Sequence, residues 1–269
     1  MARTSFHNII INVVVFAILL IFALFPLVFM LLMSMKPPEL ALQPIFIFTP
    51  TLENYVTVLF EKNFIRPISN SITVAFSSAL LALAVSVPSA YALSRRPSKY
   101  MIIALFSILF IPILPVSISA HFFSRSIGIH GTLQFMTLIL TAARAPFITL
   151  LLKPLFDAVP LQVEEAAMID GAGLFRLLRS IILPISRPAL ICSFLYGFFL
   201  SWNDYSLTYL LSNPETQLAT SFLMTQRGIF ETSWSELASS TILIAMPGII
   251  LAFILQHYLK KSFIGIGLR

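Results

Sequence analysis

Charged residues are scarce in this chain, and their scarcity excludes an ordinary soluble domain. Only 10% of the 269 residues are charged, while 58% are hydrophobic and the mean hydropathy is +0.94. Soluble domains carry roughly 25% charged residues, so the composition indicates a membrane protein. The formal net charge is +6, but the basic residues lie between apolar stretches and form no continuous patch of the kind that binds nucleic acid.

Cysteine and histidine are also rare, and the motifs of several chemistries are missing. Cys192 is the single cysteine, so neither an intrachain disulfide nor a cysteine-rich metal site is possible. The sequence contains no Gly-x-x-x-x-Gly-Lys-Ser/Thr motif to bind ATP phosphates, no nucleophile elbow and no zinc-protease motif. The histidines are scattered without helical pairing, which favours interface residues over metal ligands. They are His7, His121, His130 and His257. We therefore expect no catalytic residue, no metal and no cofactor bound by this chain.

Long apolar runs are abundant, and six of them are long enough to cross a bilayer. A span needs about 20 mostly apolar residues, and a single segment satisfies its backbone hydrogen bonds in lipid only as a helix. The first run is longer than the roughly 7–15-residue core of a signal peptide, so we expect a retained span. The sequence predicts an all-α polytopic membrane protein with one transmembrane domain over 1–269 and spans at about 9–33, 71–94, 101–122, 133–155, 187–210 and 238–259.

The distribution of Lys and Arg predicts the orientation, because cytoplasmic loops of membrane proteins are enriched in these residues. With the N-terminus inside, eleven basic residues lie in cytoplasmic segments and five in outer loops, and Arg144 lies within a span. We therefore expect both termini and the 156–186 loop to lie in the cytoplasm. The five outer residues are Lys36, Lys62, Arg66, Arg125 and Arg227.

A polar stretch in the 156–186 loop predicts two short helices joined by a tight turn. Good helix formers continue up to Asp170, and Gly171 follows, the residue type that best ends a helix because it tolerates positive φ. An insert of this kind between two spans is expected to be a docking device. The second helix is predicted to end near Pro184 and to be amphipathic, with Leu174, Phe175, Leu177 and Leu178 set against Arg176 and Arg179.

This stretch resembles the EAA loop of the membrane subunits of binding-protein-dependent ABC importers. That motif is Glu-Ala-Ala, three residues, Gly, nine residues, Ile, one residue and Leu-Pro, and it is matched without a gap by Glu165-Ala166-Ala167, Gly171, Ile181 and Leu183-Pro184. Other segments are similar to the maltose-type, MalG-like permeases of the carbohydrate-uptake family. They are Thr51–Tyr55, Asn70-Ser71, Ala90–Leu93 with Arg95, Ile127–Thr132 and Trp202–Tyr205.

The resemblance implies a type I ABC importer permease fold in the cell inner membrane and a pathway for a sugar or oligosaccharide. The implied partners are a second homologous permease, two copies of a cytoplasmic ATPase that carries ATP and Mg, an extracytoplasmic solute-binding protein and the lipid bilayer. ATP hydrolysis would belong to the partner, so the chain itself would not be an enzyme. In the ATPase-coupling loop the resemblance implies polar contacts from Glu164, Glu165 and Asp170, close packing from Ala166 and Ala167, and the turn at Gly171, with Ile181, Leu183 and Pro184 completing the motif.

A polar group in the fifth predicted span is a candidate for the substrate pathway. Trp202, Asn203, Asp204 and Tyr205 lie close to its outer end, and an intramembrane carboxylate suggests a functional site. An interfacial aromatic belt with a hydrated Asp204 is the alternative, and the resemblance favours the pathway. Arg144 departs from the family pattern and lies within roughly 7 Å of the depth of Asp204 at 1.5 Å per helical residue. We expect Arg144 to face the pathway, paired with Asp204 or in contact with an anionic or strongly hydroxylated substrate.

Other features leave alternatives open. Pro112 and Pro115 are expected to kink the third span, either around a pathway or only for packing. The 211–237 loop either reaches towards the binding protein or is an ordinary solvated loop. A self-contained channel or ion-coupled secondary carrier is the rival from another class, but it predicts paired acids deep in the spans, and Asp204 is the single acid there. A membrane-embedded enzyme would need a catalytic constellation that the sequence lacks.

Overall fold

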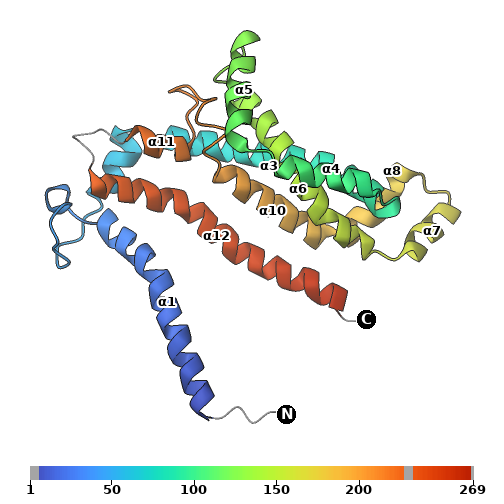
Figure 1. Ribbon diagram of the computed structural model, residues 1–269, viewed down its shortest axis with the longest axis horizontal. Helices are drawn as coiled ribbons and strands as arrows, with labels where there is room; N and C mark the ends of the chain where they lie inside the picture. The colour runs from blue at the N-terminus through green and yellow to red at the C-terminus, as the bar shows by residue number, and fades with distance from the viewer. Residues whose placement is uncertain (1–5, 227–232, 268–269) are drawn as a thin grey trace. The chain divides into compact units, whose positions relative to one another are not determined.

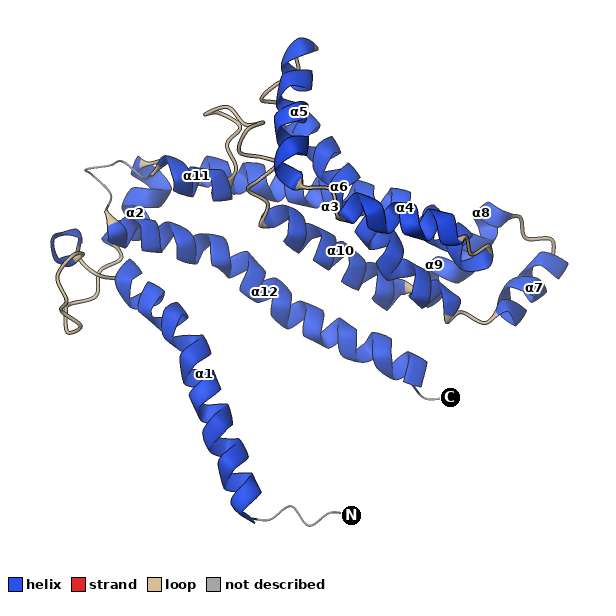
Figure 2. Ribbon diagram, viewed as in Figure 1, coloured by secondary structure: helices blue, strands red, loops and turns tan. Residues whose placement is uncertain are grey.

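The computed structural model describes residues 6–226 and 233–267, and over these residues helix is the only regular secondary structure (Figure 2). The chain divides into two compact units, residues 1–65 with 223–246 and residues 66–222 with 247–269. The expectation of one permease domain stays a prediction. Arg3, Arg227 and Arg269, which entered the orientation count, lie outside the described residues.

The first unit contains a long apolar helix, α1 (Phe6–Ser34), whose described side chains are mostly exposed. Between Ile11 and Ser34 this helix has a mean hydropathy of 3.1, and its large apolar side chains are largely exposed. A helix that is apolar on all sides requires lipid or another subunit around it. The helices of this unit are α1 (Phe6–Ser34), η1 (Pro38–Leu40), α2 (Glu53–Val56), η2 (Thr57–Glu61) and the part of α12 (Trp234–Gly267) up to Met246 (Figure 1).

The C-terminal end of α1 is held by α2 and by the beginning of α12. The buried Asn54 side chain donates from Nδ2 to the backbone oxygens of Ser34 at 3.0 Å and Lys36 at 2.8 Å. The Ser34 Oγ and Tyr55 hydroxyl are 2.6 Å apart, and Ser239 Oγ donates to Ser34 O at 2.9 Å. Carbonyl groups at a helix end have no partner inside the helix, so Asn54 and Ser239 satisfy acceptors that burial would otherwise leave without hydrogen bonds.

Replacing Asn54 with Ala is expected to destabilise this unit. The substitution removes both donors from Nδ2, and leaving a buried acceptor unsatisfied costs about 1–3 kcal/mol. The check is the melting temperature of the purified protein in a mild detergent, with Glu53→Ala as the control because Glu53 is the exposed neighbour on the same helix. Equal melting temperatures for the two variants would contradict this role for Asn54.

The second unit is a group of long helices packed on α6, which contacts both α4 and α10. Ser86 of α3 donates to the Ala145 carbonyl of α6 at 2.9 Å. Gly197 lets α10 approach closely, because a Cβ there would lie 2.9 Å from Ile148 Cδ1. The helices are α3 (Ile65–Arg95), α4 (Lys99–Leu109), α5 (Ile113–Ser126), α6 (Leu133–Asp157), α7 (Leu161–Ile169), α8 (Leu174–Leu177), η3 (Leu178–Ile182), α9 (Leu183–Ile185), α10 (Arg187–Trp202), α11 (Ala219–Thr225) and the remainder of α12 (Figure 1).

Two buried apolar clusters hold the two ends of the α3–α6 pair. One contains Met136 and Leu140 of α6 with Val74 of α3 and residues after α10. The other joins α3 and α6 to the helices that follow α6. This second cluster, which positions the loop of interest, consists of Ala82, Ala90, Tyr91, Ile148, Leu152, Phe156, Val159, Ala167, Leu177 and Ile182.

Each of the six predicted spans overlaps a helix, but two differ from the prediction in shape. Over the described residues four helices are long and apolar enough to cross a membrane, and there are up to six spans if the bent pairs at 99–126 and 174–202 are each counted as one. The predicted 101–122 span is broken between α4 and α5 by an 82° bend, because Pro112 is the residue before α5 and cannot continue the preceding helix. The predicted 187–210 span ends at Trp202, where Asn203 caps α10 through its Nδ2 bond to the Phe199 carbonyl at 2.9 Å. At the other end of the chain, α12 continues as helix to Gly267, beyond the predicted end at 259.

Candidate functional site

The loop after α6 folds as two short helical segments joined by a turn, as predicted. Helix α7 is followed by Asp170 and then by Gly171 with φ +81°, a left-handed conformation that favours glycine. The turn is closed by hydrogen bonds from Gly171 N to Met168 O at 3.0 Å and from Ala172 N to Ala167 O at 2.9 Å. These bonds satisfy carbonyls at the end of α7 and fix the direction in which α8 leaves.

One side of this loop is packed into the second unit. Ala167, Leu177 and Ile182 are buried in the cluster that α3 and α6 form, and Ile181 packs against it in part. Of the two alanines expected to pack closely, Ala167 is buried and Ala166 is exposed. The Glu165 side chain and Pro184 are also exposed, and Leu183 is half-buried.

The loop also exposes four large apolar side chains, which we call the ridge: Met168, Ile169, Leu174 and Phe175. Ile169 is 86% and Phe175 75% exposed. Of the apolar residues predicted for the second helix, Leu174 and Phe175 are exposed, whereas Leu177 is buried. The π-helical turn η3 follows α8 directly, and its wider turn lets Leu177 and Ile182, five residues apart, point inward together. A contiguous exposed apolar surface on a loop is typical of a protein–protein contact.

Glu164 is not on that exposed surface, which corrects the expectation that its carboxylate reaches a partner. The residue is 3% exposed, because neighbouring positions on a helix point about 100° apart and Glu165 takes the outward position. The Glu164 carboxylate accepts from the Tyr91 hydroxyl at 2.7 Å and from Arg95 Nε at 2.8 Å, and it forms an ion pair with the Arg95 guanidinium.

Arg95 connects three helices at this end of the unit. Its Nη2 donates to the backbone oxygens of Phe156 at 3.1 Å and Val159 at 3.4 Å, just where α6 ends. The guanidinium carbon lies 5.4 Å from the centre of the Tyr91 ring. We call Tyr91, Arg95 and Glu164 the α3–α7 clamp. In the sequence, Tyr91 and Arg95 stand out only as residues similar to those of the family. Their four-residue spacing at a helix end puts both side chains on one face, and this spacing is the feature that could have indicated a shared contact.

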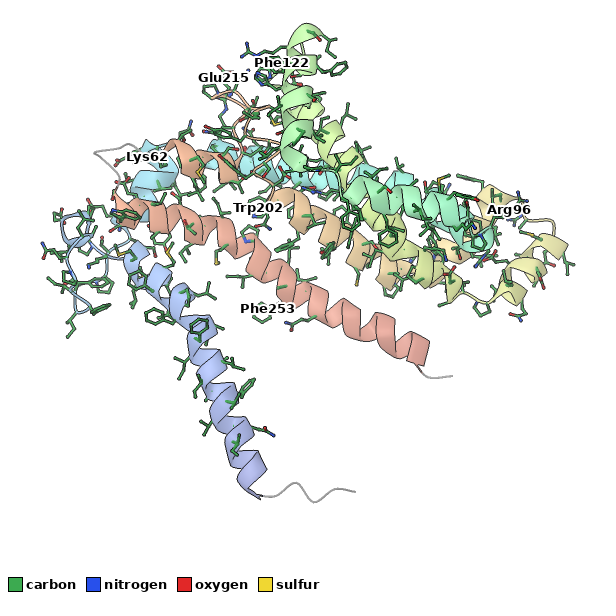
Figure 3. The ribbon with its side chains drawn as sticks, in the orientation of Figure 1. Lys62, Arg96, Phe122, Trp202, Glu215 and Phe253 are labelled. Atoms are coloured by element: carbon green, nitrogen blue, oxygen red, sulfur yellow. The ribbon has the colours of Figure 1, made fainter. Side chains whose placement is uncertain are left out.

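A second polar link lies beside the clamp. Asp157 at the end of α6 accepts from Ser94 Oγ at 2.6 Å and from Lys153 Nζ at 2.7 Å. The Lys153–Asp157 pair is an i, i+4 pair within α6, and its side chains are 20% and 41% exposed. Figure 3 labels Arg96, which follows Arg95 directly after the end of α3.

At the other polar group, the predicted pairing of Arg144 and Asp204 is present. Arg144 Nη2 donates to Asp204 Oδ2 at 2.6 Å and to the Leu200 carbonyl at 3.2 Å, and the two side chains are 14% and 5% exposed. The second oxygen, Asp204 Oδ1, accepts from Leu207 N at 3.0 Å. Arg144 Nε is buried without a hydrogen-bond partner. Because Asp204 is buried, the alternative of a hydrated carboxylate was wrong.

The neighbours of Asp204 lie in different surroundings. Trp202 is 1% exposed and stacks on Phe198 with ring centres 6.1 Å apart (Figure 3), so it is not a residue of an interfacial belt. Asn203 is exposed and caps α10, while the Tyr205 ring lies 5.1 Å from that of Tyr209. The structure therefore brings Arg144 and Asp204 together, and the other three predicted pathway residues surround the end of α10.

Two of the histidines that appear scattered in the sequence are in contact. The rings of His121 and His130 are 4.7 Å apart, because the glycine-containing turn after α5 folds back. His121 Nδ1 lies 2.7 Å from the Leu210 carbonyl, and His130 Nδ1 lies 3.2 Å from Ser124 Oγ. Burial, together with the nearby His121 and Arg125, lowers the pKa of His130 below its ordinary value. Over the described residues no group of three or more metal-ligating side chains is present.

Comparison with known proteins agrees with this architecture. The family model described as binding-protein-dependent transport system inner membrane component matches residues 1–265. The sulfoquinovosyl glycerol transport system permease protein SmoH of Agrobacterium fabrum is 28% identical over 260 residues, 94% of this chain and 91% of the relative. The trehalose/maltose transport system permease protein MalG of Thermococcus litoralis is 29% identical over 250 residues, 90% of each chain.

The fold is also found in a solved structure. A chain of a bacterial ABC transporter involved in the import of the acidic polysaccharide alginate aligns with a TM-score of 0.80 at 22% identity, over 96% of this chain and 98% of that chain. Its agreement over nearly the full length identifies the helical arrangement as that of an ABC importer permease. From the family match over 1–265, the chain belongs to the inner membrane components of binding-protein-dependent transport systems.

Proposed function

We propose that this chain is a permease subunit of an ATP-binding-cassette importer and forms part of the pathway for a sugar or oligosaccharide. The observation that supports this most is the family match together with the exposed ridge on a loop between membrane helices. The named relatives support the substrate class, since one is named for trehalose and maltose and another for sulfoquinovosyl glycerol. The protein would lie in the cell inner membrane, with both termini and the 156–186 loop in the cytoplasm.

The proposed partners are those that the family resemblance implies, and exposed surfaces of this chain suit two of them. A second homologous permease would pack beside the exposed α1, and two copies of a cytoplasmic ATPase would supply hydrolysis, with one of them binding the ridge. Glu165 and Asp170, exposed beside the ridge, would add polar contacts. ATP and Mg would be bound by the ATPase, because the sequence has no phosphate-binding loop. An extracytoplasmic binding protein would deliver the sugar.

The coupling step would be mechanical. Closure of the ATPase would displace α7 and α8, and the helices packed on them would move as rigid bodies to switch the pathway between inward-facing and outward-facing states. Packed helices are suited to this because they shift between discrete arrangements and do not deform continuously.

The test is a mild-detergent pull-down of the tagged chain from its native membrane, with ATPase activity measured on the recovered complex. We expect a second permease and an ATPase to be recovered, and Phe175→Glu to lose the ATPase because a charge would replace an exposed apolar contact. Ile47→Glu is the matched control, since Ile47 is an exposed apolar residue (94%) in the first outer loop. Recovery of the chain alone, still transporting solute in vesicles without ATP, would instead favour a self-contained carrier.

A further inference from the structure

We infer that the α3–α7 clamp is the element that makes the loop move together with α3, and that Arg95 and Glu164 are therefore positioning residues for ATP-driven transport. The inference rests on the proposed function and adds to it the route by which movement of α7 reaches a membrane helix. Arg95 and Glu164 are hydrogen-bonded to each other, to Tyr91 and to the backbone at the end of α6, so their effect would pass through the position of α7.

The attachment of α7 to the rest of the unit depends on very few side chains. Within α7 only Glu164 and Ala167 are buried. Ala167 contributes one methyl group to the apolar cluster, which resists sliding weakly. Glu164, by contrast, is held through both carboxylate oxygens. Removing the Glu164 contacts would leave α7 joined to α6 mainly through the short connection at 158–160.

The clamp is also stiff because its charges are buried. The side chains of Arg95 and Glu164 are 16% and 4% exposed, so solvent screens their attraction weakly. The guanidinium has further acceptors in the backbone of Phe156 and Val159, which orient it at the end of α6. Arg95 Nε and Nη2 both donate to Glu164 Oε1, while the Tyr91 hydroxyl donates to Glu164 Oε2. An arginine with this many hydrogen bonds has a defined geometry, so displacement of α7 is transmitted to the ends of both α3 and α6.

The Lys153–Asp157 pair provides a matched comparison at the same end of the unit. It is also an ion pair at the end of α6, but Lys153 binds only within its own helix, and both side chains are partly exposed. Exposed i, i+4 pairs contribute little to stability. Lys153→Gln therefore removes an ion pair from this region without breaking a connection to α7.

The experiment uses the complete transporter, with both permeases, the ATPase and the binding protein, reconstituted in proteoliposomes. Glu164→Gln and Arg95→Gln are expected to lower the solute transported per ATP hydrolysed by roughly two- to thirtyfold, the range for substitutions along a coupling network. This ratio is measured on the assembled complex, so it does not depend on how much complex assembles. Arg95→Lys, which keeps the charge, should retain more coupling than Arg95→Gln, and Lys153→Gln should match the unmodified protein.

Three results would overturn the inference. Transport and hydrolysis that fall together in proportion to the assembled complex would show that the clamp only stabilises the fold. A normal ratio of transport to hydrolysis in both single variants would show that α7 moves α3 without the clamp, and an equal loss in Lys153→Gln would show that any charge change at this end acts in the same way. If the proposed function itself is wrong, the unmodified chain will assemble with no ATPase. This result would be seen before any variant is tested, so it cannot be confused with failure of the inference about the clamp.

Discussion

Gly171→Val is expected to reduce solute uptake on the order of tenfold while the chain still inserts into the membrane. Gly171 has φ +81° and no atom within 4 Å of the place where a Cβ would lie, so the effect arises from backbone conformation and not from a clash. A left-handed conformation costs a residue with a side chain about 1–2 kcal/mol, more for a β-branched one, and 1.4 kcal/mol corresponds to about a factor of ten in population. The turn between α7 and α8 would open, and the ridge would lose its shape.

Substitutions at two other glycines serve as controls that distinguish a loss of coupling from a general effect of backbone strain. Gly173, two residues away, has φ −71° and ψ 164° and equally open space, so Gly173→Val should leave uptake nearly unchanged. Gly128 has φ +75° with open space in the turn after α5, so Gly128→Val imposes a similar strain far from the loop along the chain. Uptake, ATP hydrolysis and melting temperature are measured for all three. Equal uptake in Gly171→Val and Gly173→Val would disprove the role of the turn.

The geometry of the turn could be predicted from sequence because it depends on local residue types. Glycine is the residue found most often in the left-handed position after a helix. The structure has the predicted turn at Asp170-Gly171. Which glutamate points outward could not be predicted, because Glu164 and Glu165 are equivalent in the local pattern. Their difference depends on where the end of α3 places Arg95, a contact 69 residues distant in sequence.

For the membrane helices too, features that depend on local sequence could be predicted, and features that depend on contacts between distant residues could not. Hydropathy located all six apolar regions, but it does not indicate the direction of a helix axis. The prolines therefore predicted a kink in this span, but not the size of the 82° bend before Ile113. Hydropathy also did not locate the end of α10 at Trp202, where Asn203 caps the helix with its backbone N–H and its side chain. The contact between His121 and His130 requires a folded turn that spacing along the sequence does not reveal.

Pairing of Arg144 with Asp204 was one of two arrangements expected from the sequence, because an unpaired buried charge is expensive and the two residues lie at similar depths along their helices. The structure contains this ion pair. Removing one partner of a buried ion pair costs about 3–5 kcal/mol, whereas removing both is often nearly neutral. A double-mutant cycle can therefore separate the structural part of the role from the transport part.

Arg144→Met is expected to lower the melting temperature and the yield of assembled complex, because it leaves the Asp204 carboxylate buried without a counter-charge. Arg144→Met with Asp204→Asn should recover much of that stability, since the asparagine oxygen can still accept from Leu207 N and Met fills the volume of the arginine stem. If Arg144 faces the pathway, uptake per assembled complex stays low in the double variant, because the group that contacts the solute is missing. Uptake that returns in proportion to assembly would show that the pair is structural and that the substrate is bound elsewhere. Uptake and the amount of assembled complex are measured for the unmodified chain, the two single variants and the double variant in the same membranes. Uptake can then be divided by the amount of assembled complex for all four proteins.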